Sequence, residues 1–157
     1  MPNTGFILPQ SVETAAESPW LDNDWVDPAN VFGAGEASIT DNTFDNGDQS
    51  YVLKTYNFDL SSIPAGATID GVVVRINARC SVNADIDLVQ LLNTSRAKVG
   101  DNKAATPQNV VQTAADYDFG GSTDKWNNAL TDTWVKNSNF GVAVGMMNLS
   151  NLSLIHI

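Results

Sequence analysis

The sequence predicts an all-β protein, an antiparallel β-sandwich, and three observations support this class. The first is a strict alternation of apolar and polar residues over Thr68–Val82. The second is a series of about six short apolar segments separated by polar turns. The third is the abundance of Asn, Asp, Ser, Thr and Gly, which favour turns over helix interiors. A length of 157 residues fits a single domain, 1–157.

The clearest element is the middle strand, Thr68–Val82. One of its faces is apolar throughout and consists of Val72, Val74, Ile76, Ala78, Cys80 and Val82. The other face carries Arg75 and Arg79, so it must meet water or an interface. Cys80 is the only cysteine, which excludes an internal disulfide, and its position predicts a buried, unreactive thiol.

Residues 1–24 are expected to form an N-terminal arm. Within it the apolar run Phe6–Leu8 suggests an edge strand, and Ser11–Glu17 suggests a brief helical turn. Trp20 and Trp25 follow in a looped segment and are expected to pack as lids over the sandwich.

Further strands are predicted along the chain at Tyr51–Phe58, Ile86–Leu92 and Phe140–Met147. In the second of these, alternation places Ile86, Leu88 and Leu92 on one face; in the third, it groups Val142, Val144 and Met146. Between the strands the sequence predicts a turn at Ile63–Gly66, a break at Gly120-Gly121 and a short helical turn capped by Thr131.

The formal net charge is −10 and no Lys/Arg cluster offsets it. A phosphate backbone would be repelled, so no nucleic-acid partner is expected, and an anionic membrane surface is disfavoured for the same reason. No stretch approaches the ~20 apolar residues of a membrane span. Residues Met1–Gln10 lack the basic start and apolar run of a signal peptide, which predicts a protein that remains in the cytoplasm where it is made.

Catalytic groups are scarce, and we expect no enzyme activity and no cofactor. The one histidine is His156, so histidine-based triads, Cys–His pairs and His metal clusters are not expected. No glycine-rich phosphate loop is present. A glycoside-active enzyme would need paired carboxylates, and Asp85 and Asp87 share one face of a predicted strand. A solvated pair is the preferred interpretation, because nothing in the sequence around them raises a pKa.

No metal site is expected either. The segment Asp41–Asp48 superficially resembles a calcium loop, but its acidic residues, glycine and closing glutamate do not follow the EF-hand spacing. Ordinary turns in which Asp and Asn side chains bond the backbone explain it better, and the same holds for Asp22, Asp24 and Asp27.

Four tryptophans could present aromatic faces to a sugar: Trp20, Trp25, Trp126 and Trp134. The alternative, which we favour, is that they pack in the core or under loops.

The chain ends on the apolar run Leu152–Ile157. This hexapeptide resembles the translation of a common sequencing adaptor, which predicts that residues 152–157 are artefactual and that the sandwich lacks its last strand. The alternative is an authentic final strand. A missing strand would leave an unpaired edge, which natural proteins avoid.

Four phrases, in order, resemble a family of tailed-bacteriophage virion proteins of head-fibre, tail-fibre or decoration type. They are Trp25–Asn30, Phe58–Val72, Phe119–Trp126 and Asn137–Val142, and the resemblance spans Trp25–Met147. It implies a jelly-roll-like sandwich that builds a virion and that normally closes with one more strand. No catalytic, cofactor or metal residue carries over.

The resulting expectation is a non-enzymatic virion structural protein, assembled in the host cytoplasm. Its expected partners are other virion proteins or further copies of itself, with contact to a host-surface glycan. The alternative is a carbohydrate-binding or adhesion module of a cell-surface or polysaccharide-active protein, because phrases like Ile63–Ile69 also occur in such β-sandwich modules.

Overall fold

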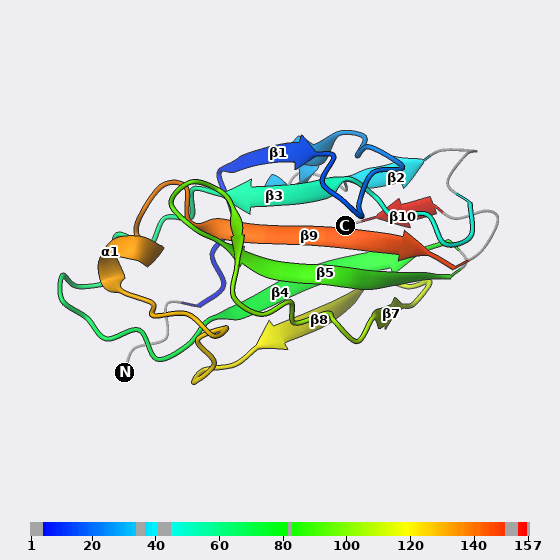
Figure 1. Ribbon diagram of the computed structural model, residues 1–157. Helices are drawn as coiled ribbons and strands as arrows, with labels where there is room; N and C mark the ends of the chain where they lie inside the picture. The colour runs from blue at the N-terminus through cyan, green and yellow to red at the C-terminus, as the bar shows by residue number, and fades with distance from the viewer. Residues whose placement is uncertain (1–4, 34–36, 41–44, 82, 150–153, 157) are drawn as a thin grey trace.

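The computed structural model describes residues 5–33, 37–40, 45–81, 83–149 and 154–156. They form an all-β protein with two curled antiparallel sheets (Figure 1). The described helical segments are short: η1 (Pro28–Phe32) and α1 (Asp132–Val135). Thr131 caps α1 as predicted, since its side chain accepts a hydrogen bond from the Trp134 backbone N–H.

The first sheet has the order β1-β3-β9-β5-β6, with β7 also pairing with β5. Its strands are β1 (Ser11–Ala15), β3 (Val52–Tyr56), β5 (Ala84–Leu92), β6 (Lys98–Val99), β7 (Gln108–Val110) and β9 (Gly141–Asn148). The second sheet has the order β2-β10-β4-β8. Its strands are β2 (Ser38–Thr40), β4 (Val73–Cys80), β8 (Ala115–Gly120) and β10 (Leu154–His156).

The main core draws buried side chains from both sheets, including Ile76 and Phe119 from the second sheet and Leu53 and Val144 from the first. The alternation predicted over Thr68–Val82 is confirmed within the shorter β4, where Ile76, Ala78 and Cys80 are buried and Arg75 is exposed. Residues 68–72 precede the strand, and Val82 lies outside the described residues. In β9, Val142, Val144 and Met146 all join this core, as predicted.

Strand β5 contains one extra residue relative to its neighbour β9. Ile86 lies opposite Met146 and Leu88 lies opposite Gly145, so Asp87 has no opposite residue and forms a β-bulge. The bulge shifts the alternation by one position. Ile86 therefore faces the main core, whereas Leu88 and Leu92 join a second cluster with Trp20. The prediction that Ile86, Leu88 and Leu92 share one face was wrong for this reason.

The second cluster lies on the outer face of the first sheet. Its buried members are Val52, Leu88, Leu92 and Ala143, and Trp20 packs against them. Both faces of the central strands are consequently covered, which explains why β3 and β5 carry apolar residues at consecutive positions.

A side chain completes the hydrogen bonding of β5 beside the bulge. On that edge β5 pairs with β6 at Leu91 and Leu92 and with β7 at residues 84–86, leaving a gap between them. Asn102 fills the gap: its amide Nδ2–H donates to the Asp87 carbonyl at 2.9 Å, and its Oδ1 accepts from the Val89 N–H at 2.9 Å. The amide side chain thus takes the place of a strand partner.

The N-terminal arm differs from the prediction. Ser11–Ala15, expected to lie in a helical turn, forms strand β1, which pairs with β3 from Ser11 opposite Tyr56 to Ala15 opposite Val52. Phe6–Leu8, expected as an edge strand, has no strand structure. The short run around Ser11 carried no strand alternation of its own, and pairing with β3 decided its conformation.

The segment interpreted as artefactual lies partly within the described chain. Leu154–His156, part of the segment interpreted as artefactual, forms β10 between β2 and β4; residues 152, 153 and 157 lie outside the described chain. Among the described residues, β10 pairs with β4 at Arg79 and Cys80.

Replacing Asn102 by Ala should destabilise the protein by about 2 kcal/mol or more, because two backbone groups of the buried strand β5 lose their partner. Chemical denaturation of the purified chain measures this loss. Asn109→Ala is the matched control: its exposed amide bonds only the Asp85 carboxylate at 3.2 Å, and its removal should cost less than about 0.5 kcal/mol. Equal effects of the two substitutions would refute the role assigned to Asn102.

Candidate functional site

The β-bulge places a carboxylate beneath an aromatic lid. The Trp20 indole N–H lies 3.1 Å from both carboxylate oxygens of Asp87. The Gln49 side-chain amide donates a second hydrogen bond to the same carboxylate. Asp87 is 8% exposed, so its charge is held between two donors and largely out of water. The three residues join the N-terminal arm, the loop before β3 and strand β5.

The Trp20 indole can lie over Asp87 because residue 145, beneath the ring, is a glycine. A Cβ atom on Gly145 would approach the Trp20 Nε1 to 2.7 Å and Cδ1 to 2.8 Å, so a larger residue would displace the indole. The Lys98 ammonium also lies near the indole, 4.4 Å from the centre of the Trp20 ring. Glu17 forms ion pairs with Lys98, at 3.0 Å, and with Lys54.

Burial raises the pKa of Asp87, and the nearby charge of Asp85 adds to this effect, while the Gln49 and Trp20 hydrogen bonds act in the opposite direction. Asp85 is bonded instead by the Asn109 amide at 3.2 Å. The preferred sequence interpretation, a pair of solvated carboxylates, was therefore wrong for Asp87. The two carboxylates have different surroundings, and the Asp87 oxygens already bind two side-chain donors. Through its carboxylate, Asp87 thus links the N-terminal arm and the loop before β3 to strand β5.

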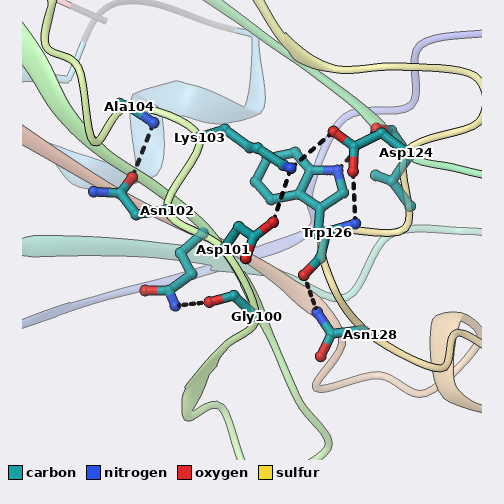
Figure 2. Close-up of polar contacts among 10 residues, drawn as sticks. Gly100, Asp101, Asn102, Lys103, Ala104, Asp124, Trp126 and Asn128 are labelled. Atoms are coloured by element: carbon teal, nitrogen blue, oxygen red, sulfur yellow. Dashed lines mark hydrogen bonds and ion pairs between the residues drawn. The ribbon is translucent and has the colours of Figure 1, made fainter.

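A second polar cluster joins the loop after β6 to the loop after β8 (Figure 2). The Lys103 ammonium lies 3.2 Å from Asp101 Oδ2 and 2.9 Å from Asp124 Oδ2, and 5.7 Å from the centre of the Trp126 ring. Lys103 lowers the pKa of Asp124, as does the backbone hydrogen bond that Asp124 accepts from Trp126. Trp126 is fully buried, and its indole N–H donates to the Val72 carbonyl at 2.9 Å. This cluster thus links the loop after β6, the loop after β8 and Val72 around the buried Trp126 indole.

The outward face of the second sheet carries an ion-paired array. The Arg75 guanidinium makes two hydrogen bonds of 2.6 Å to Asp118 and lies 3.5 Å from Asp116. The pKa of Asp118 is lowered by its hydrogen bonds to Arg75. Phe6, which is 58% exposed, lies over the guanidinium at 4.1 Å. The predicted water- or interface-facing side of β4 is therefore exposed and charged, with arginine and aspartate on adjacent strands.

The remaining predicted candidates are spread through the structure. Trp25 and Trp126 are buried, at 5% and 0% exposure, and Trp20 covers Asp87, so the four tryptophans do not form one exposed platform. Cys80 is buried, as predicted, and its thiol bonds the Val110 carbonyl at 3.0 Å.

No group of three or more potential metal-ligating side chains occurs among the described residues. Part of the calcium-like segment, residues 41–44, lies outside them. In the described remainder, Asp48 accepts a hydrogen bond from the Asp45 backbone N–H, which is the turn bonding that the sequence suggested.

A cleft of about 510 Å³ lies where three distant segments meet. It is lined by Gln10, which precedes β1, by residues 57–61, which follow β3, and by Lys136 and Ser138, which follow α1. Sequence reasoning missed this cleft, because each segment alone resembles an ordinary polar turn and only the fold brings them together.

Comparison of the chain with protein-family models, with curated proteins and with solved structures finds no match. In the described part of the chain, no helix has the length and apolar character needed to cross a membrane.

Replacing Asp87 by Asn should change the pH dependence of stability. Because its pKa is raised in the folded state, the folded chain holds this proton to higher pH than the unfolded chain does. The contribution of Asp87 to stability is therefore greatest below its ordinary pKa of 3.8 and is lost as pH rises through the folded-state value. The free energy of unfolding of Asp87→Asn should rise relative to that of the wild type as pH increases.

Denaturant titrations between about pH 3 and pH 7 test this difference. The lowered pKa values of Asp118 and Asp124 act with the opposite sign, but they are common to both proteins and cancel. Asp27→Asn serves as the control, because Asp27 is exposed and its side chain makes no capping hydrogen bond to η1. Parallel curves of unfolding free energy against pH for the wild type and Asp87→Asn would contradict the burial of the Asp87 carboxylate in the folded chain.

Proposed function

We propose that this chain is a non-enzymatic structural protein of a tailed-bacteriophage virion, of fibre, tail or head-decoration type. In this proposal the two sheets form a jelly-roll-like sandwich that acts by assembly in the host cytoplasm. Its partners are other virion proteins or further copies of itself, and it contacts the host surface.

The observation that carries the proposal is the direct contact between two of the four phrases on which the resemblance rests. Phe58–Val72 and Phe119–Trp126 are joined by hydrogen bonds from the Val72 N–H to the Asp124 carbonyl, at 3.0 Å, and from the Gly121 N–H to the Val72 carbonyl, at 3.2 Å. Asn137–Val142 follows α1, whose Asp132 accepts from the Gly66 N–H at 3.1 Å. Phrases far apart in sequence thus form connected joints of one fold, as expected for a shared structural signature.

The close packing at these joints explains why the phrases contain glycine. A Cβ atom on Gly71 would lie 2.4 Å from the Gly121 carbonyl oxygen, and one on Gly120 would lie 2.4 Å from the Val72 carbonyl oxygen. Neither position accepts a larger residue without moving backbone. The backbone packing of this fold therefore requires the glycines that these phrases contain.

The outward face of the second sheet suits an assembly role. Arg75 and Asn77 on β4 lie beside Asp118 and Asp116 on β8, so both charges are presented on neighbouring strands. Such a face offers complementary partners to a second virion subunit and disfavours nonspecific association.

The alternative proposal is a carbohydrate-binding or adhesion module. Its original basis, a platform of four tryptophans, is weakened by the burial of Trp25 and Trp126. The polar cleft beside Asn57 is the feature that favours it.

Mass spectrometry of virus particles purified on density gradients from the source material tests the virion proposal. The tryptic peptide 55–75, between Lys54 and Arg75, should co-purify with the major capsid protein while host ribosomal proteins are depleted. Recovery of the peptide from the cell envelope or secreted fraction, and its absence from particles, would reject the proposal in favour of the adhesion module.

A further inference from the structure

We infer that the cleft between Gln10, Asn57 and Ser138 binds a neutral saccharide. This inference deepens the host-surface contact of the proposed function and rests on that function for the origin of the saccharide. The hydrogen-bonding capacity, the apolar surface and the charge of the cleft residues, and the backbone contacts that hold them, support this inference.

The first step is the hydrogen-bonding capacity of the cleft. Within the described chain, the side chains of Gln10, Asn57 and Ser138 make no hydrogen bond to another protein group, yet all three line the same cleft. Amides and hydroxyls both donate and accept, as do the hydroxyl groups of a sugar. Three such side chains from three distant segments therefore line one cleft, which suits a ligand of the same character.

The second step is the apolar part of the lining. Phe58 and Leu60 are half-buried in the cleft wall, between the polar side chains. An aromatic ring beside hydrogen-bonding groups suits a sugar, which has an apolar C–H face and a polar rim. A small inorganic ion would use none of this apolar surface.

The third step is charge. Lys136 lines the cleft but is already engaged, 3.2 Å from Asp132 and 3.3 Å from the Ile63 carbonyl. Asp59 bonds the Ser61 hydroxyl at 2.6 Å, and the Ser61 hydrogen bonds lower its pKa, so it is ionised near neutral pH. Lys136 and Asp132 neutralise each other as an ion pair, so the remaining negative charge of Asp59 disfavours an anionic sugar and favours a neutral one.

The fourth step is preorganisation. Asp132 joins Lys136 to the Gly66 N–H, which ties the turn after α1 to the loop after β3. Asn57 has φ 60, in the left-handed region, and the Gln10 N–H donates to the Tyr56 carbonyl at 3.2 Å. These contacts hold the backbone segments that carry the cleft residues, which lowers the entropic cost of binding.

The experiment is a titration of the ¹⁵N-labelled full-length chain, followed by amide chemical shifts. The probes are glucose, galactose, mannose, N-acetylglucosamine and their disaccharides cellobiose, lactose and chitobiose. We expect at least one probe to shift saturably the amides of residues 57–61 and 136–138, with no comparable change in β5 or β8.

Two variants test the assignment. Asn57→Gly removes the amide while tolerating the same backbone conformation, and Gln10→Ala removes the opposite amide; each should weaken binding about tenfold. Gln108→Ala is the control, because it removes an exposed amide on β7, outside the cleft, and should leave affinity unchanged. Unchanged spectra away from each substitution show that the variants fold.

The assignment is overturned if no probe causes saturable shifts, or if the shifts survive both cleft variants unchanged. Because the titration uses the isolated chain, either result leaves the virion proposal to the particle experiment, and the two failures remain distinguishable.

Discussion

The structure depends on one extra residue in its central strand pair. Asp87 has no opposite residue in β9, so the apolar side chains of β5 change faces at this point. Ile86 packs into the main core, while Leu88 and Leu92 pack on the outer surface of the same sheet. A continuous alternation would have left that outer surface without two of its apolar residues.

The same extra residue is bonded by side chains from three other segments. Its backbone carbonyl is satisfied by the Asn102 side chain, and its carboxylate by Trp20 and Gln49. An isolated buried carboxylate would be costly, and the two donors reduce this cost. The bulge thus helps to position the N-terminal arm and the loops that carry Gln49 and Asn102.

The same arrangement occurs at two places in the fold: an indole packs against a glycine and donates its N–H to an oxygen. Trp20 lies over Gly145 and donates to Asp87, and Trp126 lies against Gly120 and donates to the Val72 carbonyl. The absence of a side chain allows each ring its close approach. Trp134 differs, because within the described chain its buried Nε1 has no hydrogen-bond partner. The Trp20 and Trp126 rings are therefore fixed by both packing and hydrogen bonding.

The sequence predicted the all-β class and the elements governed by local pattern, such as the alternation in β4 and the Thr131 cap of α1. It did not predict the bulge, because an aspartate between Ile86 and Leu88 fits an uninterrupted alternation equally well. Strand β1 was missed because its conformation comes from pairing with β3. The cleft was missed because Gln10, Asn57 and Ser138 are adjacent only in the folded chain. Local periodicity is readable from one sequence, whereas insertions in register and long-range convergence are not.

The most direct test of this account is a double-mutant cycle between Trp20→Phe and Asp87→Asn, measured as free energies of unfolding at neutral pH. The phenylalanine keeps an aromatic ring over Gly145 and removes the indole N–H that reaches the carboxylate. We predict a coupling free energy of about 1 kcal/mol or more, because a hydrogen bond to a charged group is lost in each single variant. Additivity within about 0.3 kcal/mol would show that Trp20 and Asp87 do not depend on each other and would contradict the account.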